Sequence, residues 1–127
     1  MILKTTTVSD CRSKGYVICE GSDNHIIEVN GKDIGVVSTS ATNRGLYVYY
    51  VEIDKDLRGY GYFREALIRV LNLYSESELS GMSTADAAPK WQGVGAELEV
   101  EKDEDIQLYD EIGECIPFTL SLDKLLG

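Results

Sequence analysis

The loop Arg58-Gly59-Tyr60-Gly61 carries the residues of this chain that are best suited to binding a phosphate. Glycine at positions 59 and 61 lets the backbone turn tightly and approach a ligand closely. The helical pattern that follows would present unpaired N–H groups and the positive end of its dipole to the loop. Residues 54–69 hold four basic side chains and three acids, in a chain of net charge −10. We therefore predict an anion cradle over Leu57–Phe63; the alternative is an ordinary tight turn between a strand and a helix.

Two residues just before this loop could transfer protons. Glu52 is an acid in an otherwise apolar strand, and a buried carboxylate with a raised pKa can act as a general base near neutral pH. The alternative is that Glu52 points to a face edged by solvent or pairs with an arginine. Tyr49 shares the alternate face of the same strand with Tyr47. These two tyrosines are either catalytic groups or core aromatics.

The remaining chemically active side chains are sparse. His25 is the only histidine and follows a turn at the start of a strand, so we expect it on the surface. No second ligand is spaced to join it, and no metal site is predicted. The three cysteines, Cys11, Cys19 and Cys115, are widely separated and form no Cys-x-x-Cys motif. We expect reduced thiols in a reducing compartment, which indicates a cytoplasmic protein.

The loop lies between a strand and a helix that would position it. The run Leu46–Ile53 is almost entirely aromatic and β-branched, which predicts a strand near the middle of a sheet and buried on both faces. After Asp56 the apolar period changes to 3.6, which predicts a helix of about three turns. Its apolar face is formed by Phe63, Ala66, Leu67, Val70, Leu71 and Tyr74.

Further strands are predicted on both sides of this unit. Asn30-Gly31 is a strong hairpin signal, and it joins His25–Val29 to Ile34–Thr39. Pro89 limits any helix within Thr84–Val94 to a short one. Together these elements predict one α/β domain over residues 1–127. The other predicted strands are Ile2–Val8, Tyr16–Cys19, Glu78–Met82, Ala96–Val100 and Ile116–Leu122.

Charge and hydropathy exclude several classes of partner. From Glu97 to Gly127 there are ten acids and two lysines, so a polyanion would have to bind elsewhere. Nucleic-acid binding is not expected, because it depends on clustered basic residues. Apolar runs are far shorter than the roughly 20 residues needed to cross a bilayer. The acidic run Glu97–Glu114 is either a solvated face or a surface that attracts a basic substrate or partner.

The loop resembles motif A of the GNAT superfamily of N-acetyltransferases, which reads Gln/Arg-x-x-Gly-x-Gly/Ala after the fourth strand. Arg58, Gly61 and Phe63 occupy these positions, and Ile53 lies five residues before the arginine. The order of the elements from Ile26 to Val100 is also similar. The resemblance implies a mixed, mostly antiparallel central sheet, with one main helix after strand four and a second short helix.

The resemblance also implies a cofactor and a reaction. In that family the pantetheine arm of acetyl-CoA lies between strands four and five, its pyrophosphate sits on motif A, and an amine takes the acetyl group directly. Here the implied acceptor is a protein lysine or another cationic amine, with Glu52 and Tyr49 as catalytic groups. Arg58 and the backbone of the loop would hold the pyrophosphate. The full set of implied cofactor-binding residues is Val51, Ile53, Leu57, Arg58, Gly59, Tyr60, Gly61, Tyr62 and Phe63.

Three departures from the family pattern keep a second interpretation open. Phe63 replaces the last small residue of the motif, and Trp91 stands where the family often has a tyrosine acid. Tryptophan cannot act as a general acid. The 25 residues before Ile26 are interpreted as strands and turns, without the usual helices, so a large acceptor or a second copy of the chain would complete the site. The alternatives are a catalytically inactive acidic binding or inhibitory module and, third, a structural domain without a ligand.

Overall fold

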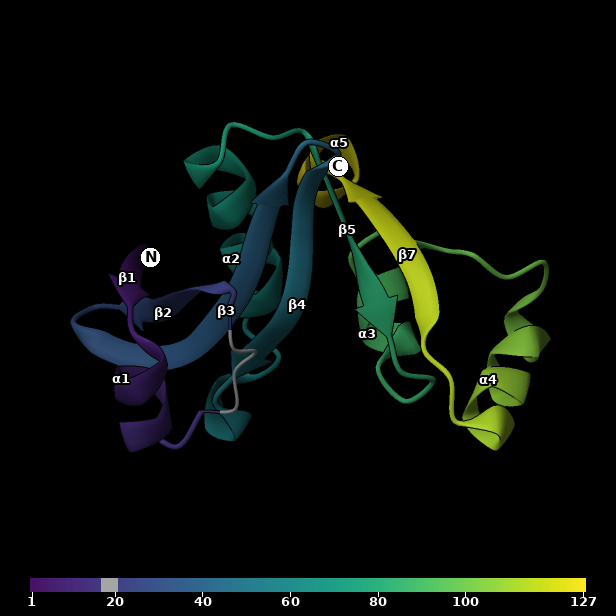
Figure 1. The fold of residues 1–127 in the computed structure, drawn as a ribbon, viewed down its shortest axis with the longest axis horizontal. Helices are drawn as coiled ribbons and strands as arrows, with labels where there is room; N and C mark the ends of the chain where they lie inside the picture. The colour runs from purple at the N-terminus through teal and green to yellow at the C-terminus, as the bar shows by residue number, and fades with distance from the viewer. Residues whose placement is uncertain (17–20) are drawn as a thin grey trace.

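The computed structural model describes residues 1–16 and 21–127, and the strands among them form one sheet in the order β1-β2-β3-β4-β5-β7-β6 (Figure 1). Neighbouring strands are antiparallel except β4 and β5, which are parallel. The expected mixed, mostly antiparallel sheet is confirmed. The strands are β1 (Ile2–Thr6), β2 (Asp23–Val29), β3 (Lys32–Thr42), β4 (Gly45–Ile53), β5 (Glu78–Ser83), β6 (Glu97–Leu98) and β7 (Ile116–Ser121).

The helices of the described residues are short, with one exception. The exception is α2, which follows β4 and a single 3₁₀ turn at Lys55–Leu57. None of the described helices is long and apolar enough to cross a membrane. The helices are α1 (Val8–Ser13), α2 (Tyr62–Leu73), α3 (Ala88–Gly93), α4 (Ile106–Ile112) and α5 (Leu122–Leu126).

The predicted hairpin is confirmed as β2 and β3. Asn30 and Gly31 have φ angles of 52° and 78°, and Val29 pairs with Lys32 across the turn. Two successive residues with positive φ match the twist of the flanking strands, which is why Asn-Gly is favoured at such turns. The turn therefore fixes the pairing of β2 and β3 next to it, up to the register shift between Ile27 and Glu28.

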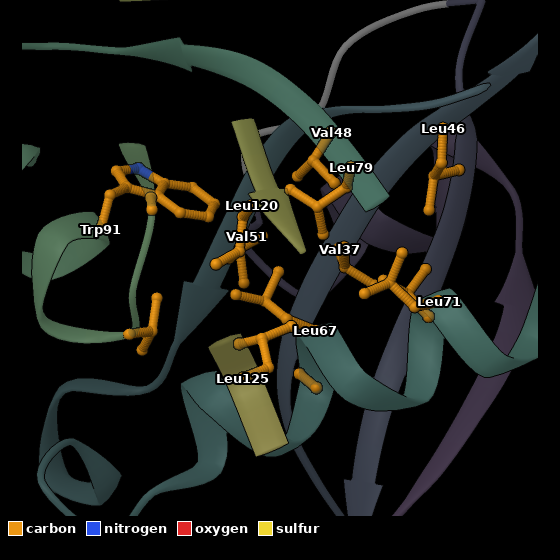
Figure 2. Close-up of a cluster of buried hydrophobic side chains, with 14 of the residues drawn as sticks. Val37, Leu46, Val48, Val51, Leu67, Leu71, Leu79, Trp91, Leu120 and Leu125 are labelled. Carbon is orange, nitrogen blue, oxygen red and sulfur yellow. The ribbon is translucent and has the colours of Figure 1, made fainter. Parts of the chain in front are cut away.

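The main core lies between the sheet and α2 (Figure 2). Ala66, Leu67, Val70 and Leu71 are fully buried, as the period of 3.6 predicts. They pack against apolar residues of β3, β4 and the C-terminal elements. Burying one such leucine side chain stabilises the fold by about 1.5–3 kcal/mol, so α2 is held firmly against the sheet.

The opposite face of the first strands is covered by α1, which the sequence analysis did not predict. The strand expected over Ile2–Val8 ends at Thr6, because the Thr7 hydroxyl accepts a hydrogen bond from the Asp10 amide at 3.1 Å and caps a helix. The expectation of only strands and turns before Ile26 is therefore wrong. The predicted strand Tyr16–Cys19 lies, beyond Tyr16, outside the described residues.

The central position predicted for β4 is confirmed, but burial on both faces is wrong. Val48 and Val51 are buried with the core, whereas Tyr49 is 48% exposed. The pairing with β3 slips here, because Ser38 pairs with Tyr50 and Thr39 with Val48. Tyr49 is thus the extra residue of a β-bulge, which keeps the valines on either side of it facing the core. An aromatic run seen only as sequence does not distinguish a bulged, one-sided strand from a doubly buried one.

The C-terminal third differs most from the predictions. Strands β5 and β7 are confirmed, but the strand expected over Ala96–Val100 is reduced to β6. Pro89 lies in the first turn of α3, where its missing N–H costs nothing, so it opens this helix rather than interrupting it. The acidic run contains the unpredicted helix α4, none of whose residues is buried. Figure 1 places α4 apart from the sheet, beyond β7.

Candidate functional site

A cleft opens where β4 and β5 diverge. The two strands pair only over three positions, from Leu46↔Leu79 to Val48↔Gly81, and then separate (Figure 1). The last pair is tight, since a Cβ on Gly81 would lie 2.9 Å from the Val48 carbonyl oxygen and 2.8 Å from the Phe118 ring. Beyond it lies a cavity of about 350 Å³, here called the cleft. It is lined by Tyr49, Tyr50, Val51, Glu52, Arg58, Met82, Ser83, Thr84, Ala87, Lys90 and Trp91.

A second cavity, of about 230 Å³, lies against the glycine loop and is here called the loop pocket. Gly59 and Gly61 have φ angles of 89° and 81°, and a Cβ on either would meet no atom within 4 Å. Glycine is therefore favoured there by backbone conformation and not by space. The residues that line the loop pocket are Ile53, Leu57, Arg58, Gly59, Gly61, Tyr62, Phe63 and Lys90.

The start of α2 presents amides to the loop pocket. The N–H of Glu65 donates to the Gly61 carbonyl at 3.1 Å, so the amides of Tyr62, Phe63 and Arg64 precede the first bond of the helical ladder. No side chain caps this end of the helix. A twelve-residue helix adds the positive end of its dipole. The geometry is that of an anion cradle.

Arg58 links the loop to the end of β4. Its Nε donates to the Ile53 carbonyl at 2.9 Å, and the residue lines both the loop pocket and the cleft. Among the described residues, Arg58 forms no ion pair with a carboxylate. Its guanidinium is therefore available to a ligand at the junction of the two cavities.

Two other basic residues of this segment have structural partners instead. Arg64 donates to the carbonyls of Leu125 at 3.0 Å and Gly93 at 3.3 Å, and so caps the ends of α5 and α3. Arg69 pairs with Glu65 at 3.6 Å along α2. The local positive charge expected from the sequence is thus reduced at the loop pocket.

Lys90 is the cation that sequence reasoning missed. It lies on α3 and lines both cavities with Arg58, although 31 residues separate them in the chain. Its Nζ lies 4.4 Å from the centre of the Phe63 ring. Partial desolvation, and then the charge of Arg58, lower the pKa of Lys90, while Glu52 opposes this shift. A lysine immediately before Trp91 in a short helix was the available signal.

Glu52 and two tyrosines of β4, Tyr49 and Tyr50, line the cleft. Glu52 is half-buried there and forms no ion pair among the described residues. Burial, and then the charge of Glu52, raise the pKa of Tyr50. Tyr49 lies at the same cavity, with its ring 4.8 Å from that of Tyr47. The exposure of Tyr49 makes the core-aromatic interpretation wrong for that residue.

Tyr16 reaches this end of β4 from the segment after α1. Its hydroxyl donates to the Asp54 carboxylate at 3.0 Å. Burial, and then this hydrogen bond, raise the pKa of Tyr16. Tyr16 packs against the same buried cluster as Tyr50, which lines the cleft, so this segment lies on that face of the sheet.

The predicted site residues are brought together with one exception. Tyr60 lines neither cavity and is 70% exposed, with its ring tilted on that of Tyr62. Trp91 is 7% exposed and packs between Phe63 and Phe118, at centroid distances of 5.0 Å and 4.2 Å. Trp91 is thus a core residue whose edge lines the cleft.

The expectation of a surface His25 is wrong. The side chain is 4% exposed, and its Nε2 lies 2.8 Å from the Tyr74 hydroxyl at the end of α2. Burial lowers the pKa of His25, and Asp23 opposes this effect. No group of three His, Cys, Asp or Glu residues that could hold a metal occurs in the described ranges.

We compared the chain with known proteins and solved structures. No family model matches the sequence, and no curated protein matches it. The structure is similar to N-acetylglutamate synthase from Neisseria gonorrhoeae, solved with coenzyme A and N-acetyl-glutamate, with a TM-score of 0.60 and 14% identity. The match covers 91% of this chain and 31% of that one, so this chain spans about a third of that protein.

Two further matches cover nearly whole chains. A spermidine N-acetyltransferase chimera from Vibrio cholerae SpeG and hSSAT has a TM-score of 0.66 and 11% identity, and 100% of each chain is covered. A protein of the GNAT family from Bacteroides thetaiotaomicron has a TM-score of 0.65 and 16% identity, over 95% of this chain and 87% of that one. The chain has the fold of the GNAT acetyltransferases, as its loop motif implied.

Proposed function

We propose that this chain is an acetyl-CoA-dependent N-acetyltransferase that transfers the acetyl group directly to an amine. The observation that carries the proposal is the junction of the two cavities, because Arg58 and Lys90 line both. The loop pocket would take the pyrophosphate, and the cleft would take the pantetheine arm and the thioester. The similar structure from Neisseria gonorrhoeae holds coenzyme A.

The pantetheine arm would lie along the edge of β4 that faces the cleft. Beyond Val48 this edge has no partner in β5, so its backbone groups can bond an amide-containing ligand as an added strand would. The Ile53 carbonyl already accepts the Arg58 side chain, so Val51 is the better candidate for bonding the arm. Leu57 and Phe63 give the loop pocket an apolar wall.

The reaction would form a C–N bond and break the C–S bond of the thioester. Glu52 would accept the proton of the attacking amine, directly or through water, because it is the carboxylate in the cleft. Trp91 cannot protonate the departing thiolate. Tyr50, a phenol with a raised pKa in the same cleft, can donate that proton, and Tyr49 would contact the acceptor at the mouth.

A cationic amine suits this mouth as the acceptor. Tyr49 and Glu52 line the cleft and offer an aromatic face and a carboxylate, both of which attract an ammonium group. Tyr49 and Met82 are 48% and 45% exposed, so a large acceptor such as a protein lysine could reach the cleft, and a second copy of the chain could cover its mouth. One similar protein is a spermidine acetyltransferase.

The proposal treats residues 1–127 as one acyltransferase domain that works in the cytoplasm. Cys11 and Cys115 are free thiols, which suits a reducing compartment, and Cys19 lies outside the described residues. A nucleic acid is not proposed as a partner, because the chain carries a net charge of −10 and such binding depends on clustered basic residues.

Calorimetric titration with acetyl-CoA and desulfo-CoA tests the cofactor. Binding of both ligands, followed by acetylation of spermidine or of lysines in a protein mixture, supports the enzyme. Binding without transfer supports the second candidate, an inactive acidic binding module. The feature that favours this module is α4, an acidic helix whose Leu108 and Ile112 are more than half exposed.

A further inference from the structure

Two cations meet at the junction of the cavities, and Glu52, the carboxylate of the same cleft, forms a salt bridge with neither. Arg58 comes from the glycine loop and Lys90 from α3, and both line the loop pocket and the cleft. Neither forms an ion pair among the described residues. The charge of Arg58 lowers the pKa of Lys90, so the two groups are close enough to repel each other. An anion between them would attract both groups and offset their mutual repulsion.

The position of Lys90 is set by a row of aromatic rings. Its ammonium lies 4.4 Å from the centre of the Phe63 ring, within the range of a cation–π contact. Phe63 packs edge-on against Trp91 at 5.0 Å, and Trp91 packs on the buried Phe118 at 4.2 Å. Packing against Trp91 and Phe118 therefore fixes the Phe63 ring, and the ammonium group of Lys90 lies over that ring.

We propose that Lys90, seated on Phe63, is the second cation of a diphosphate clamp whose first cation is Arg58. The proposal rests on the proposed function, because the diphosphate is that of coenzyme A. It assigns a role to Phe63, the residue that departs from the small residue of the motif. Glu52 also faces Lys90, and with the clamp occupied it remains free for the acceptor.

A diphosphate fits better than a single small anion for a geometric reason. The amides of Tyr62 and Phe63 lie at the start of α2, whereas Arg58 and Lys90 lie at the junction with the cleft. A ligand with two linked phosphates can contact the amides with one phosphate and the cations with the other. Its remaining chain then leaves through the junction into the cleft.

The test is calorimetric titration of the wild type, K90M and K90R with ADP, coenzyme A and pantetheine. A charge-assisted hydrogen bond to phosphate predicts that K90M weakens ADP and coenzyme A by roughly 10- to 100-fold and leaves pantetheine unchanged. K90R should recover most of the loss. Lys102 is exposed in the acidic segment, so K102M removes the same charge elsewhere and serves as the matched control.

The seat on Phe63 is tested by F63L. If the ring positions the ammonium, K90M should weaken coenzyme A binding less in the F63L background than in the wild-type background, because the two residues act together. Equal effects in both backgrounds would overturn the role of Phe63. Melting curves show whether each variant is folded. If K90M is not folded, K90R serves as the test variant.

Each proposal has its own contradicting result. If the wild type binds coenzyme A and K90M binds it equally well, the clamp is wrong and the proposed function stands. If K90M weakens pantetheine as much as coenzyme A, Lys90 contacts the arm and the clamp is again wrong. If the wild type binds neither ADP nor coenzyme A, the proposed function falls with the clamp.

Discussion

Arg58 Nε donates a 2.9 Å hydrogen bond to the carbonyl of Ile53, and this bond fastens the glycine loop to the last residue of β4. The strand and the loop are the two parts of the candidate site that must keep a fixed separation. One side chain thus joins the part that would hold the pantetheine arm to the part that would hold the phosphates.

Replacing Arg58 by alanine should weaken acetyl-CoA binding by about 1–3 kcal/mol, the range for charge-assisted hydrogen bonds. The matched control is R64A, which removes the same charge from a residue that caps α3 and α5. R64A should lower the free energy of unfolding more than it changes affinity. Titration and chemical unfolding of both variants check this pair. Equal affinity losses in both would mean that Arg58 acts only through general charge.

Glu52→Gln should lower kcat by about 100-fold or more and leave coenzyme A affinity nearly unchanged, because a general base contributes roughly 10²–10⁴-fold. The carboxylate lies in the cleft and not in the loop pocket, which is why binding and turnover should separate. Steady-state kinetics with a saturating amine measure the effect. A full rate in E52Q would remove Glu52 from the mechanism.

Gly61→Ala should destabilise the fold by about 1–2 kcal/mol, because its φ of 81° is unfavourable for a residue with a Cβ. Gly93 gives the control, since it lies in α3 without a positive φ and a Cβ there would meet no atom within 4 Å. G93A should be neutral or stabilising, because alanine is the better helix former. Equal effects of the two substitutions in thermal unfolding would contradict the strained loop.

Burial of His25 predicts a loss of stability in mild acid. Its pKa is lowered in the folded state from an ordinary value of 6.5, so the unfolded chain binds the proton more readily. Stability from the neutral ring is fully present above pH 6.5 and declines as pH falls below it. The free energy of unfolding of H25Q, measured from pH 7.5 to 5, should fall less steeply than that of the wild type. Parallel curves would show that His25 does not titrate in this range.

The lowered pKa of Lys90 predicts a reactive lysine. A lowered pKa leaves more neutral amine at pH 8, so Lys90 should be acylated by a small anhydride faster than Lys102, although both side chains are exposed. ADP should protect Lys90 if a phosphate lies against it. Peptide mapping by mass spectrometry reports both rates. Slower labelling of Lys90 than of Lys102 without ligand would contradict the lowered pKa.

Short sequence patterns correctly predicted the parts of the fold that are determined by neighbouring residues. The Asn30-Gly31 turn, the apolar face of α2 and the glycine loop each follow from a few adjacent residues. The bulge at Tyr49 and the buried contact of His25 with Tyr74 depend on partners in other elements. No periodicity within one strand contains that information.

The candidate site was predicted to a similar degree. The loop pocket is formed almost entirely by the motif, so its lining could be read from one short segment. Lys90, Met82 and Ser83 enter the site through β5 and α3, which the chain reaches only after α2. These residues line the cleft only because β4 and β5 diverge in the folded structure, which no local sequence pattern indicates.

The most direct test of the whole account is one calorimetric titration of the folded wild-type chain with acetyl-CoA, repeated with R58A. The account predicts saturable binding at one site per chain, weakened by about 10-fold or more in R58A, as expected for loss of a charge-assisted contact. No heat and no thermal shift at millimolar acetyl-CoA, with the chain folded, would contradict it.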